Sequence, residues 1–330
     1  MQTIQAEKGE DMTNIRDLAK MSGVSVSTVS RVLNNHPYVS EEKKLAVLAA
    51  IESTNYNRNI NAVHLSRGKT QLMGVVLPFT DTPYFALLLK GIAQKALEYD
   101  YKLVLFQTDY AEEKEMEALQ MLKQKQIDSL IICSRKSDLS LIQEHIQYGT
   151  IVLCEKMKKE SLPSTFIDHY KVFFQALEYL YQKGHKEIGY CVGRKTGANS
   201  FLREQAYMDF LKKYELPFNA DYIMDDCLYF EDGEKVIEKM KRLDTRPTAL
   251  LVTSDQVAAG IMIACQKEQL SIPKQLAIIG FNNEPIAKMM NITTIDIPLV
   301  ELGNNLFLQA MGEDVSSKEI SVKLIERGTV

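Results

Sequence analysis

Two groups of side chains in this sequence could bind a charged partner. The first lies in residues 25–34, where small hydroxylated residues and a single arginine, Arg31, recur on one side of a predicted helix. Small hydroxylated side chains allow close approach to a phosphate backbone, and an arginine can bind the paired acceptors of a guanine. These residue types predict a helix that lies in the major groove of DNA. The alternative is an ordinary solvent-exposed helix with a Ser/Thr-rich face.

A capped helix and a glycine turn position this stretch. Residues 14–21 begin with the N-cap residue Asn14, the acid Asp17 follows three positions later, and apolar residues recur at helical spacing. Gly23 can adopt the positive φ of a tight helix exit, and the hydroxyl of Ser25 can cap the next helix. The apolar residues that should pack inward are Leu18, Ala19, Val29, Val32 and Leu33. Two short helices joined by such a turn form a helix-turn-helix.

A third helix is predicted by the same signals. Ser40 is a cap residue, and Glu41 and Glu42 place negative charge at the positive end of the helix dipole. The apolar stripe expected on this helix comprises Leu45, Val47, Leu48 and Ile51. Three helices that end by Asn55 make one small domain.

The region resembles a known DNA-binding module. Residues 14–34, with Val39-Ser40, Tyr56 and residues 62–65, are similar to the headpiece and hinge of the LacI/GalR family of bacterial transcription regulators, and the pattern Val-Ser-x-x-Thr-Val-Ser-Arg-Val-Leu-Asn at 24–34 is very specific. The DNA contacts that the residues and this resemblance imply are Asn14, Ser25, Val26, Ser27, Thr28, Ser30, Arg31, Asn34, Ser40, Tyr56, Asn59, Ala62 and Leu65.

The polar, Asn-rich residues 56–70 predict a linker with little intrinsic helix. In the resembling family, this segment forms a hinge helix when a dimer sits on its operator, and a leucine from each hinge opens a base step in the minor groove. Leu65 matches that leucine, and Ala62 matches the small residue that lets two hinges touch. Arg58 stands where the family usually has proline, so the unbound hinge is less stiff and can gain a phosphate contact. The alternative for Leu65 is burial against its own core.

Length and charge distribution agree with a nucleic-acid partner. A chain of 330 residues, 45% of them apolar, is long enough for two or three domains with a sizeable core. The formal net charge is −4, yet residues 13–69 hold eight basic and four acidic side chains. A basic region in an otherwise acidic chain fits binding to nucleic acid.

Several function classes are disfavoured by what the sequence lacks. Five cysteines without metal-like spacing predict a reducing, cytoplasmic location, and no apolar run is long enough to span a membrane. Residues 1–12 are polar and acidic and predict a disordered leader rather than an export signal. The alternative is an upstream start, since Met12 stands where members of the resembling family usually begin. The chain has no nucleotide-binding glycine motif, and its five histidines stand singly. An enzyme is therefore disfavoured, and neither a cofactor nor a metal is expected.

From residue 72 onward, short apolar runs alternate with amphipathic helical patterns. The predicted strands are 72–79, 101–107, 129–133, 151–154, 187–192, 248–252 and 276–280. The predicted helices are 84–98, 112–123, 139–148, 172–182, 201–214, 234–243 and 256–268. This alternation predicts two parallel sheets covered by helices, with ligands beyond the carboxyl ends of the strands.

The resemblance implies an α/β chain in which a three-helix headpiece precedes a two-lobed sensor domain similar to periplasmic sugar-binding proteins. The expected divisions are a leader at 1–12, the headpiece at 13–58, the hinge at 59–70 and an effector-binding and dimerisation domain at 71–330. Lobe 1 of that domain is expected at about 71–167 plus 299–324, and lobe 2 at about 168–298 plus 325–330.

The second group of side chains follows the predicted strands. By motif, the resemblance and the strand-end positions imply effector-binding roles for Asp81, Phe85, Glu155, Arg203, Ser254, Asp255 and Asn282. Ser254 and Asn282 stand where the family has Asn and Asp, which weakens the usual acceptors for sugar hydroxyls. Asp81 and Asp255 could instead cap the helices that follow them, whereas Arg203 has no capping role.

Together these features predict a homodimeric or larger repressor of carbohydrate-related genes that binds palindromic operator DNA and has no membrane partner. Helix 84–98 should expose an apolar stripe for the dimer, formed by Phe85, Leu88, Leu89, Ile92 and Ala96. The effector would be a sugar or a sugar phosphate, and the missing carboxylate at Asn282 favours the phosphate. Residues 193–197 predict a flexible basic loop beside the cleft. A sensor that responds to a phosphorylated carrier protein is the alternative, whereas the helix-turn-helix and the absent signal peptide argue against a solute-binding protein.

Overall fold

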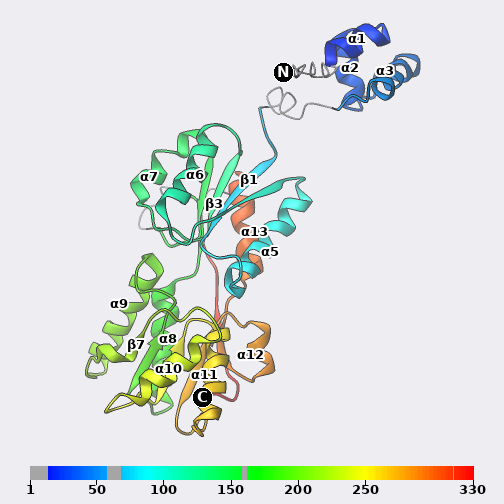
Figure 1. The fold of residues 1–330 in the computed structure, drawn as a ribbon. Coiled ribbons are helices and arrows are strands. Elements are labelled where there is room, and N and C mark those ends of the chain that lie inside the picture. Colours follow the sequence, from blue (N-terminus) through cyan, green and yellow to red (C-terminus); the bar gives the residue numbers. More distant parts are fainter. Residues whose placement is uncertain (1–13, 58–67, 158–161, 315) are drawn as a thin grey trace, which may run out of the picture. The chain divides into compact units, whose positions relative to one another are not determined.

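The computed structural model describes residues 14–57, 68–157, 162–314 and 316–330. The chain divides into two compact units, and the boundary in the sequence lies between Gly68 and Lys69. The described part of unit 1 consists of three helices (Figure 1). Their bounds are α1 Ile15–Ser22, α2 Val26–Leu33 and α3 Glu41–Thr54.

The predicted caps of the first two helices are present. The side chain of Asn14 accepts from the backbone N–H of Asp17 while the Asp17 carboxylate accepts from the N–H of Asn14 at 3.0 Å, which closes a capping box. Gly23 ends α1 with φ at +66°. The hydroxyl of Ser25 accepts from the N–H of Thr28 at 3.2 Å and caps α2. The helix-turn-helix therefore forms as the sequence predicts.

The apolar stripe predicted for α3 is partly wrong. Val47 and Ala50 are buried among residues of the first two helices, whereas Leu45 and Leu48 are 63% and 45% exposed. With about 3.6 residues per turn, positions 47, 50 and 51 share one face and position 45 points away from it. Ser40 occupies the N-cap position of α3, but its side chain makes no capping hydrogen bond.

Unit 2 contains the two sheets predicted from the alternating pattern, and each has six strands. The first has the order β11-β5-β4-β3-β1-β2 and is parallel throughout. The second has the order β12-β10-β9-β8-β6-β7, and only its edge strand β12 runs antiparallel. We call the parts built on the first and second sheets lobe 1 and lobe 2.

The strands of lobe 1 are β1 Leu72–Leu77, β2 Lys102–Gln107, β3 Ser129–Ile132, β4 Thr150–Leu153, β5 Ser164–Phe166 and β11 Ser317–Glu319. Those of lobe 2 are β6 Ile188–Cys191, β7 Ile223–Met224, β8 Ala249–Val252, β9 Ala277–Phe281, β10 Thr293–Asp296 and β12 Lys323–Ile325. The helices of unit 2 are α5 Pro83–Glu98, α6 Glu112–Lys123, α7 Leu139–Gln143, α8 His169–Gln182, α9 Ala198–Lys213, α10 Asp232–Lys241, α11 Asp255–Lys267, α12 Pro285–Met289 and α13 Leu299–Ala310.

All seven predicted strands and all seven predicted helices have a counterpart, with shifted ends. The predicted helix 139–148 is split into α7 and the 3₁₀ turn Ile146–Tyr148. The sequence missed α12, α13 and the strands β5, β7, β10, β11 and β12. Four of these strands have only two or three residues, and β10 reads Thr-Thr-Ile-Asp, so none of them shows the apolar run that marked the predicted strands.

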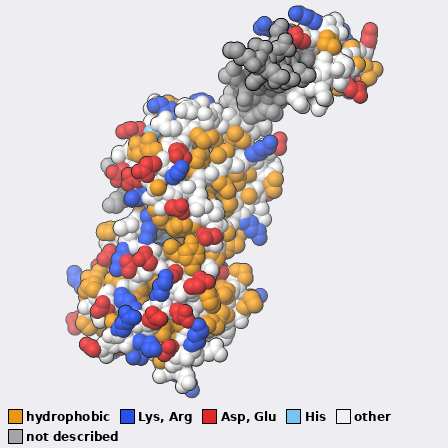
Figure 2. Space-filling view, viewed as in Figure 1, with side chains coloured by type: hydrophobic (Ala, Val, Ile, Leu, Met, Phe, Trp, Pro, Cys, Tyr) orange, Lys and Arg blue, Asp and Glu red, His pale blue; other side chains and the backbone are white. Residues whose placement is uncertain are grey.

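Most of the apolar stripe of α5 is not exposed as predicted, although Phe85 and Leu89 are only half-buried. Leu88, Ile92 and Ala96 are buried, and α5 packs closely along α13 (Figure 1). A Cβ placed at Gly303 would lie 2.2 Å from the carbonyl oxygen of Leu88, so the two helices touch through their backbones. The expectation of a dimer therefore cannot rest on these three side chains. Figure 2 shows hydrophobic side chains gathered on the side of lobe 1 where α5 lies.

Two general properties follow from the described residues. None of the helices described is both long and apolar enough to cross a membrane. In the same residues, no cluster of His, Cys, Asp and Glu side chains is arranged to hold a metal ion.

Candidate functional sites: the headpiece surface and the interlobe cavity

The outward face of α2 is small, polar and singly basic. Val26, Ser27, Arg31 and Asn34 are exposed, and Ser30 is half-buried. The hydroxyl of Ser25 lies 2.8 Å from that of Ser27 and 2.9 Å from that of Thr28, so the start of the helix carries a row of linked hydroxyl groups. Asn34 donates to the carbonyl of Ser30 at 2.9 Å. This surface has the chemistry of a helix that approaches phosphates and bases.

Other predicted DNA contacts have structural roles as well. Tyr56 is half-buried and packs against the core of unit 1, and the side chain of Asn14 is used in the capping box. Ser40 is exposed at the start of α3. Asn59, Ala62 and Leu65 lie outside the described residues, so their assignment stays a prediction.

A cavity of about 340 Å³ lies between the two lobes of unit 2, at the carboxyl ends of strands from both sheets. Five of the predicted effector residues line it, namely Phe85, Glu155, Arg203, Ser254 and Asn282. Polar and charged lining residues outside the predicted effector set include Tyr110, Ser134, Arg135, His169, Arg194, Ser200, Asp226, Thr253 and Glu284. The rule that ligands bind beyond strand ends would have found most of them.

Asp81 and Asp255 are not part of the cavity lining. Asp255 is fully buried and accepts from the hydroxyl of Thr294 at 2.7 Å and from the N–H of Glu284 at 2.8 Å. Burial raises the pKa of Asp255 to about 7. Asp81 is exposed, and its carboxylate accepts from the hydroxyl of Tyr229 at 3.3 Å. The structure thus gives Asp255 a structural position and does not bring either residue to the cavity.

Arg203 projects into the cavity from α9 with its charge uncompensated. Its guanidinium Nη2 lies 3.2 Å from Nδ1 of His169, and no carboxylate among the described residues forms an ion pair with it. Its buried Nε has no hydrogen-bond partner in the described residues. Burial lowers the pKa of Arg203 to about 10, and burial together with the Arg203 charge lowers the pKa of His169 well below its ordinary value. The imidazole is therefore neutral and its Nδ1 can accept from the guanidinium.

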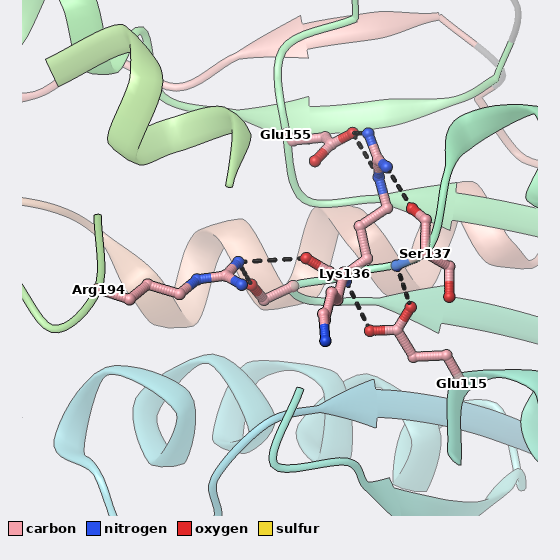
Figure 3. Close-up of polar contacts among 7 residues, drawn as sticks. Glu115, Lys136, Ser137, Glu155 and Arg194 are labelled. Atoms are coloured by element: carbon pink, nitrogen blue, oxygen red, sulfur yellow. Dashed lines mark hydrogen bonds and ion pairs between the residues drawn. The ribbon is translucent and has the colours of Figure 1, made fainter. Parts of the chain in front are cut away.

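Glu155 is paired with an arginine that the sequence did not reveal. Its Oε1 lies 2.6 Å from Nη2 and 2.9 Å from Nε of Arg135, which follows β3 (Figure 3). The loop that carries Arg135 is held by Glu115, whose carboxylate accepts from the N–H groups of Lys136 and Ser137 at 2.7 and 2.8 Å. The negative charge of Glu155 is thus balanced within lobe 1.

Arg194 reaches from the segment after β6 in lobe 2 to loops of lobe 1. Its guanidinium carbon lies 3.5 Å from the centre of the Tyr110 ring. Its Nη2 donates to the carbonyl of Arg135 at 3.1 Å and to the hydroxyl of Ser134 at 3.4 Å (Figure 3). The predicted flexible basic loop therefore contains a side chain with a defined position between the lobes.

Asn282 holds a carboxylate beside the cavity. It has φ at +94° and is buried, and its Nδ2 donates to Oε1 of Glu284 at 3.0 Å. Glu284 is only 2% exposed, and burial raises its pKa, which favours the neutral form. Glu284 thus supplies a carboxyl group near position 282, where the family has an aspartate, but its raised pKa reduces its negative charge.

Comparison with known proteins identifies both units. Residues 14–59 match the model of bacterial regulatory proteins of the lacI family, and residues 70–327 match that of periplasmic binding proteins and the sugar-binding domain of the LacI family. The chain belongs to the LacI family. As a member, it is a DNA-binding transcriptional regulator with a ligand-binding sensor domain.

Relatives and solved structures agree with this assignment. The HTH-type transcriptional regulator YkvZ of Bacillus subtilis (strain 168) is 42% identical over 324 residues, which cover 97% of this chain and 100% of that protein. The NTD biosynthesis operon regulator NtdR of the same organism is 36% identical, with 96% and 98% covered. The lac repressor dimer bound to operator and the anti-inducer ONPF has the same fold, with a TM-score of 0.80, 23% identity, and 96% of this chain and 98% of that chain covered. These relatives therefore match this chain over nearly its whole length, from the headpiece through both lobes.

Proposed function

We propose that this regulator represses carbohydrate-related genes as a homodimer on palindromic operators, and that an anionic, hydroxylated ligand such as a sugar phosphate controls it from the interlobe cavity. The exposed, hydroxylated face of α2 with its single Arg31 supports DNA reading. The predicted division into leader, headpiece, hinge and two lobes is part of this proposal.

The proposal that the ligand is an anion rests on the environment of Arg203. It faces the cavity as a half-buried cation without a carboxylate partner in the described residues, whereas Arg135 and Glu155 neutralise each other. Charged groups buried without a counterion are costly, and an anionic ligand that accepts from the guanidinium recovers that cost. A neutral sugar would supply acceptors but no charge.

The ligand can control DNA binding only through a difference in its affinity for two arrangements of the lobes. A ligand that prefers one arrangement shifts the population toward it, and its coupling to operator binding is reciprocal. The operator should therefore change the affinity for the ligand by the same factor by which the ligand changes the affinity for the operator.

Two measurements test this function. Selection of sites from a random DNA pool should return palindromes, and calorimetry with matched neutral and phosphorylated hexoses should show binding of the phosphorylated compounds. The Arg203→Gln variant should lose that binding and keep operator affinity without ligand. Binding of neutral sugars alone would refute the charge argument, and binding of neither class would support control by a partner protein.

A further inference from the structure

Arg194 of lobe 2 contacts lobe 1 in two ways. The flat guanidinium lies 3.5 Å over the Tyr110 ring, which is a close cation–π contact, and Nη2 donates to the carbonyl of Arg135 and the hydroxyl of Ser134. Tyr110, Ser134 and Arg135 follow β2 and β3 of lobe 1, whereas Arg194 follows β6 of lobe 2. One side chain therefore bridges the two lobes across the cavity.

Both sides of this bridge are held in place. Ser200 donates from its hydroxyl to the carbonyl of Arg194 at 2.8 Å. Gly197 has φ at +105°, and a Cβ there would lie 2.7 Å from Nη2 of Arg194, so the loop leaves room for the guanidinium where a larger residue would not. On the other lobe, Glu115 fixes the backbone of Lys136 and Ser137, next to the carbonyl that accepts from Arg194.

Arg194 still has donors to offer a ligand. Only Nη2 makes hydrogen bonds within the described residues, so Nη1 and Nε remain while the seat on Tyr110 is kept. Like Arg203, it lacks a carboxylate partner in the part of the chain that is described. The pKa of Arg203 is lowered chiefly by burial and further by the charge of Arg194, so the two cations act on each other.

We propose that Arg194 is a specificity-determining residue that selects doubly charged ligand groups, phosphomonoesters over monoanions, by binding them together with Arg203 while it bridges the lobes. The two half-buried guanidinium groups line one cavity and repel each other, and a bound dianion offsets more of that repulsion than a bound monoanion does. The inference rests on the proposed function, because it assumes an anion at Arg203. It adds that the ligand group is a dianion, and that the ligand binds the same arginine that connects the two lobes.

Hexose 6-phosphates and the corresponding hexose 6-sulfates test this selection. At about pH 8 the phosphate is a dianion, since its second pKa is about 6, whereas the sulfate ester carries one charge in nearly the same shape. Calorimetry on the full-length wild-type protein should show tighter binding of the phosphate by about tenfold or more, because its second negative charge strengthens the same hydrogen bonds to the guanidinium groups.

Three variants separate the roles. Arg194→Gln should bind phosphate and sulfate with similar, weak affinity through Arg203, whereas Arg194→Lys should keep part of the preference because it keeps the charge. Arg203→Gln should lose both ligands. Lys195→Gln is the matched control, because Lys195 is the next residue, is exposed, pairs with Asp225 at 3.1 Å and does not line the cavity. Circular dichroism confirms that each variant is folded.

The outcomes separate this inference from the proposed function. If the wild type prefers the phosphate and Arg194→Gln retains the full preference, the role of Arg194 is wrong while the anionic ligand stands. If the wild type binds both anions equally, selection by charge number is wrong. If the wild type binds neither anion, the proposed ligand class and this inference both fail.

Discussion

Replacing Asp255 by Asn should change how the stability of unit 2 depends on pH. The Asp255 side chain is fully buried, and burial raises its pKa from 3.8 to about 7. Because the folded-state pKa lies above the unfolded value, the folded state holds this proton over a range in which the unfolded state has released it. The stabilisation is therefore complete below about pH 4 and is lost as the pH rises through about 7.

The size of this effect follows from the two pKa values. They differ by about 3, and each pKa unit corresponds to about 1.4 kcal/mol, which gives about 4 kcal/mol as an upper bound. The hydrogen bonds from Thr294 and from the N–H of Glu284 favour the ionised form and oppose the effect of burial. The negative charge of Glu284 raises the pKa further.

Urea unfolding followed by circular dichroism from about pH 4.5 to 8 measures the effect, since the chain contains no tryptophan for fluorescence. Expressed as wild type minus Asp255→Asn, the free energy of unfolding should fall by as much as about 4 kcal/mol over this range. Asp244→Asn, which removes an exposed carboxylate, is the matched control. Parallel curves for wild type and Asp255→Asn would show that Asp255 titrates normally and would refute this reasoning. Asp255→Asn should also affect ligand binding less than Arg203→Gln does, because only Arg203 lines the cavity.

Three further substitutions and one measurement of assembly test other parts of the molecule. Arg31→Ala should lose about 1–3 kcal/mol of operator binding and relax preference at one base pair, as measured by competition binding; an equal loss on all sequences would place Arg31 on the phosphate backbone instead. Ser25→Ala removes the acceptor of the Thr28 N–H and should lower headpiece stability by about 1 kcal/mol in thermal unfolding, and an unchanged midpoint would contradict the capping role. Gly303→Ala places a Cβ 2.2 Å from the Leu88 carbonyl oxygen, so unfolding should show a loss of about 1–3 kcal/mol even though alanine favours helices; a gain would mean that α5 and α13 separate easily. Sedimentation should show a dimer at micromolar concentration, and a monomer both free and on DNA would end the homodimer proposal.

The sequence by itself determined the headpiece, because its signals are local. Asn14 with Asp17, Gly23 and Ser25 each act on a backbone within a few residues, and each adopts the predicted cap or turn. The sequence also determined the class of unit 2, since buried parallel strands show as short apolar runs and amphipathic helices show their period within one segment. The α3 stripe failed because Leu45 and Leu48 are apolar without being on the packed face.

Only the tertiary structure decided the short strands and the face of α5. The strands β11 and β12 have three residues each, too few to carry a period, and β11 pairs with β5, about 150 residues earlier in the chain. Leu88 and Ile92 of α5 are covered by α13, which lies some two hundred residues further along the chain. Amphipathic spacing shows that a face is apolar but does not show what covers it.

Some features of the cavity could be predicted from the sequence, and others could not. Arg203 could be chosen from its motif, and five of the seven predicted effector residues meet around one space. Only the fold shows that Arg135 pairs with Glu155 and that the Arg194 guanidinium stacks on the Tyr110 ring. Only the fold shows, too, that Asp255 is buried away from the cavity. The physical reason is that the net charge of a cavity depends on which ionisable groups find partners, and those partners come from separate strand ends that only the folded sheets bring together.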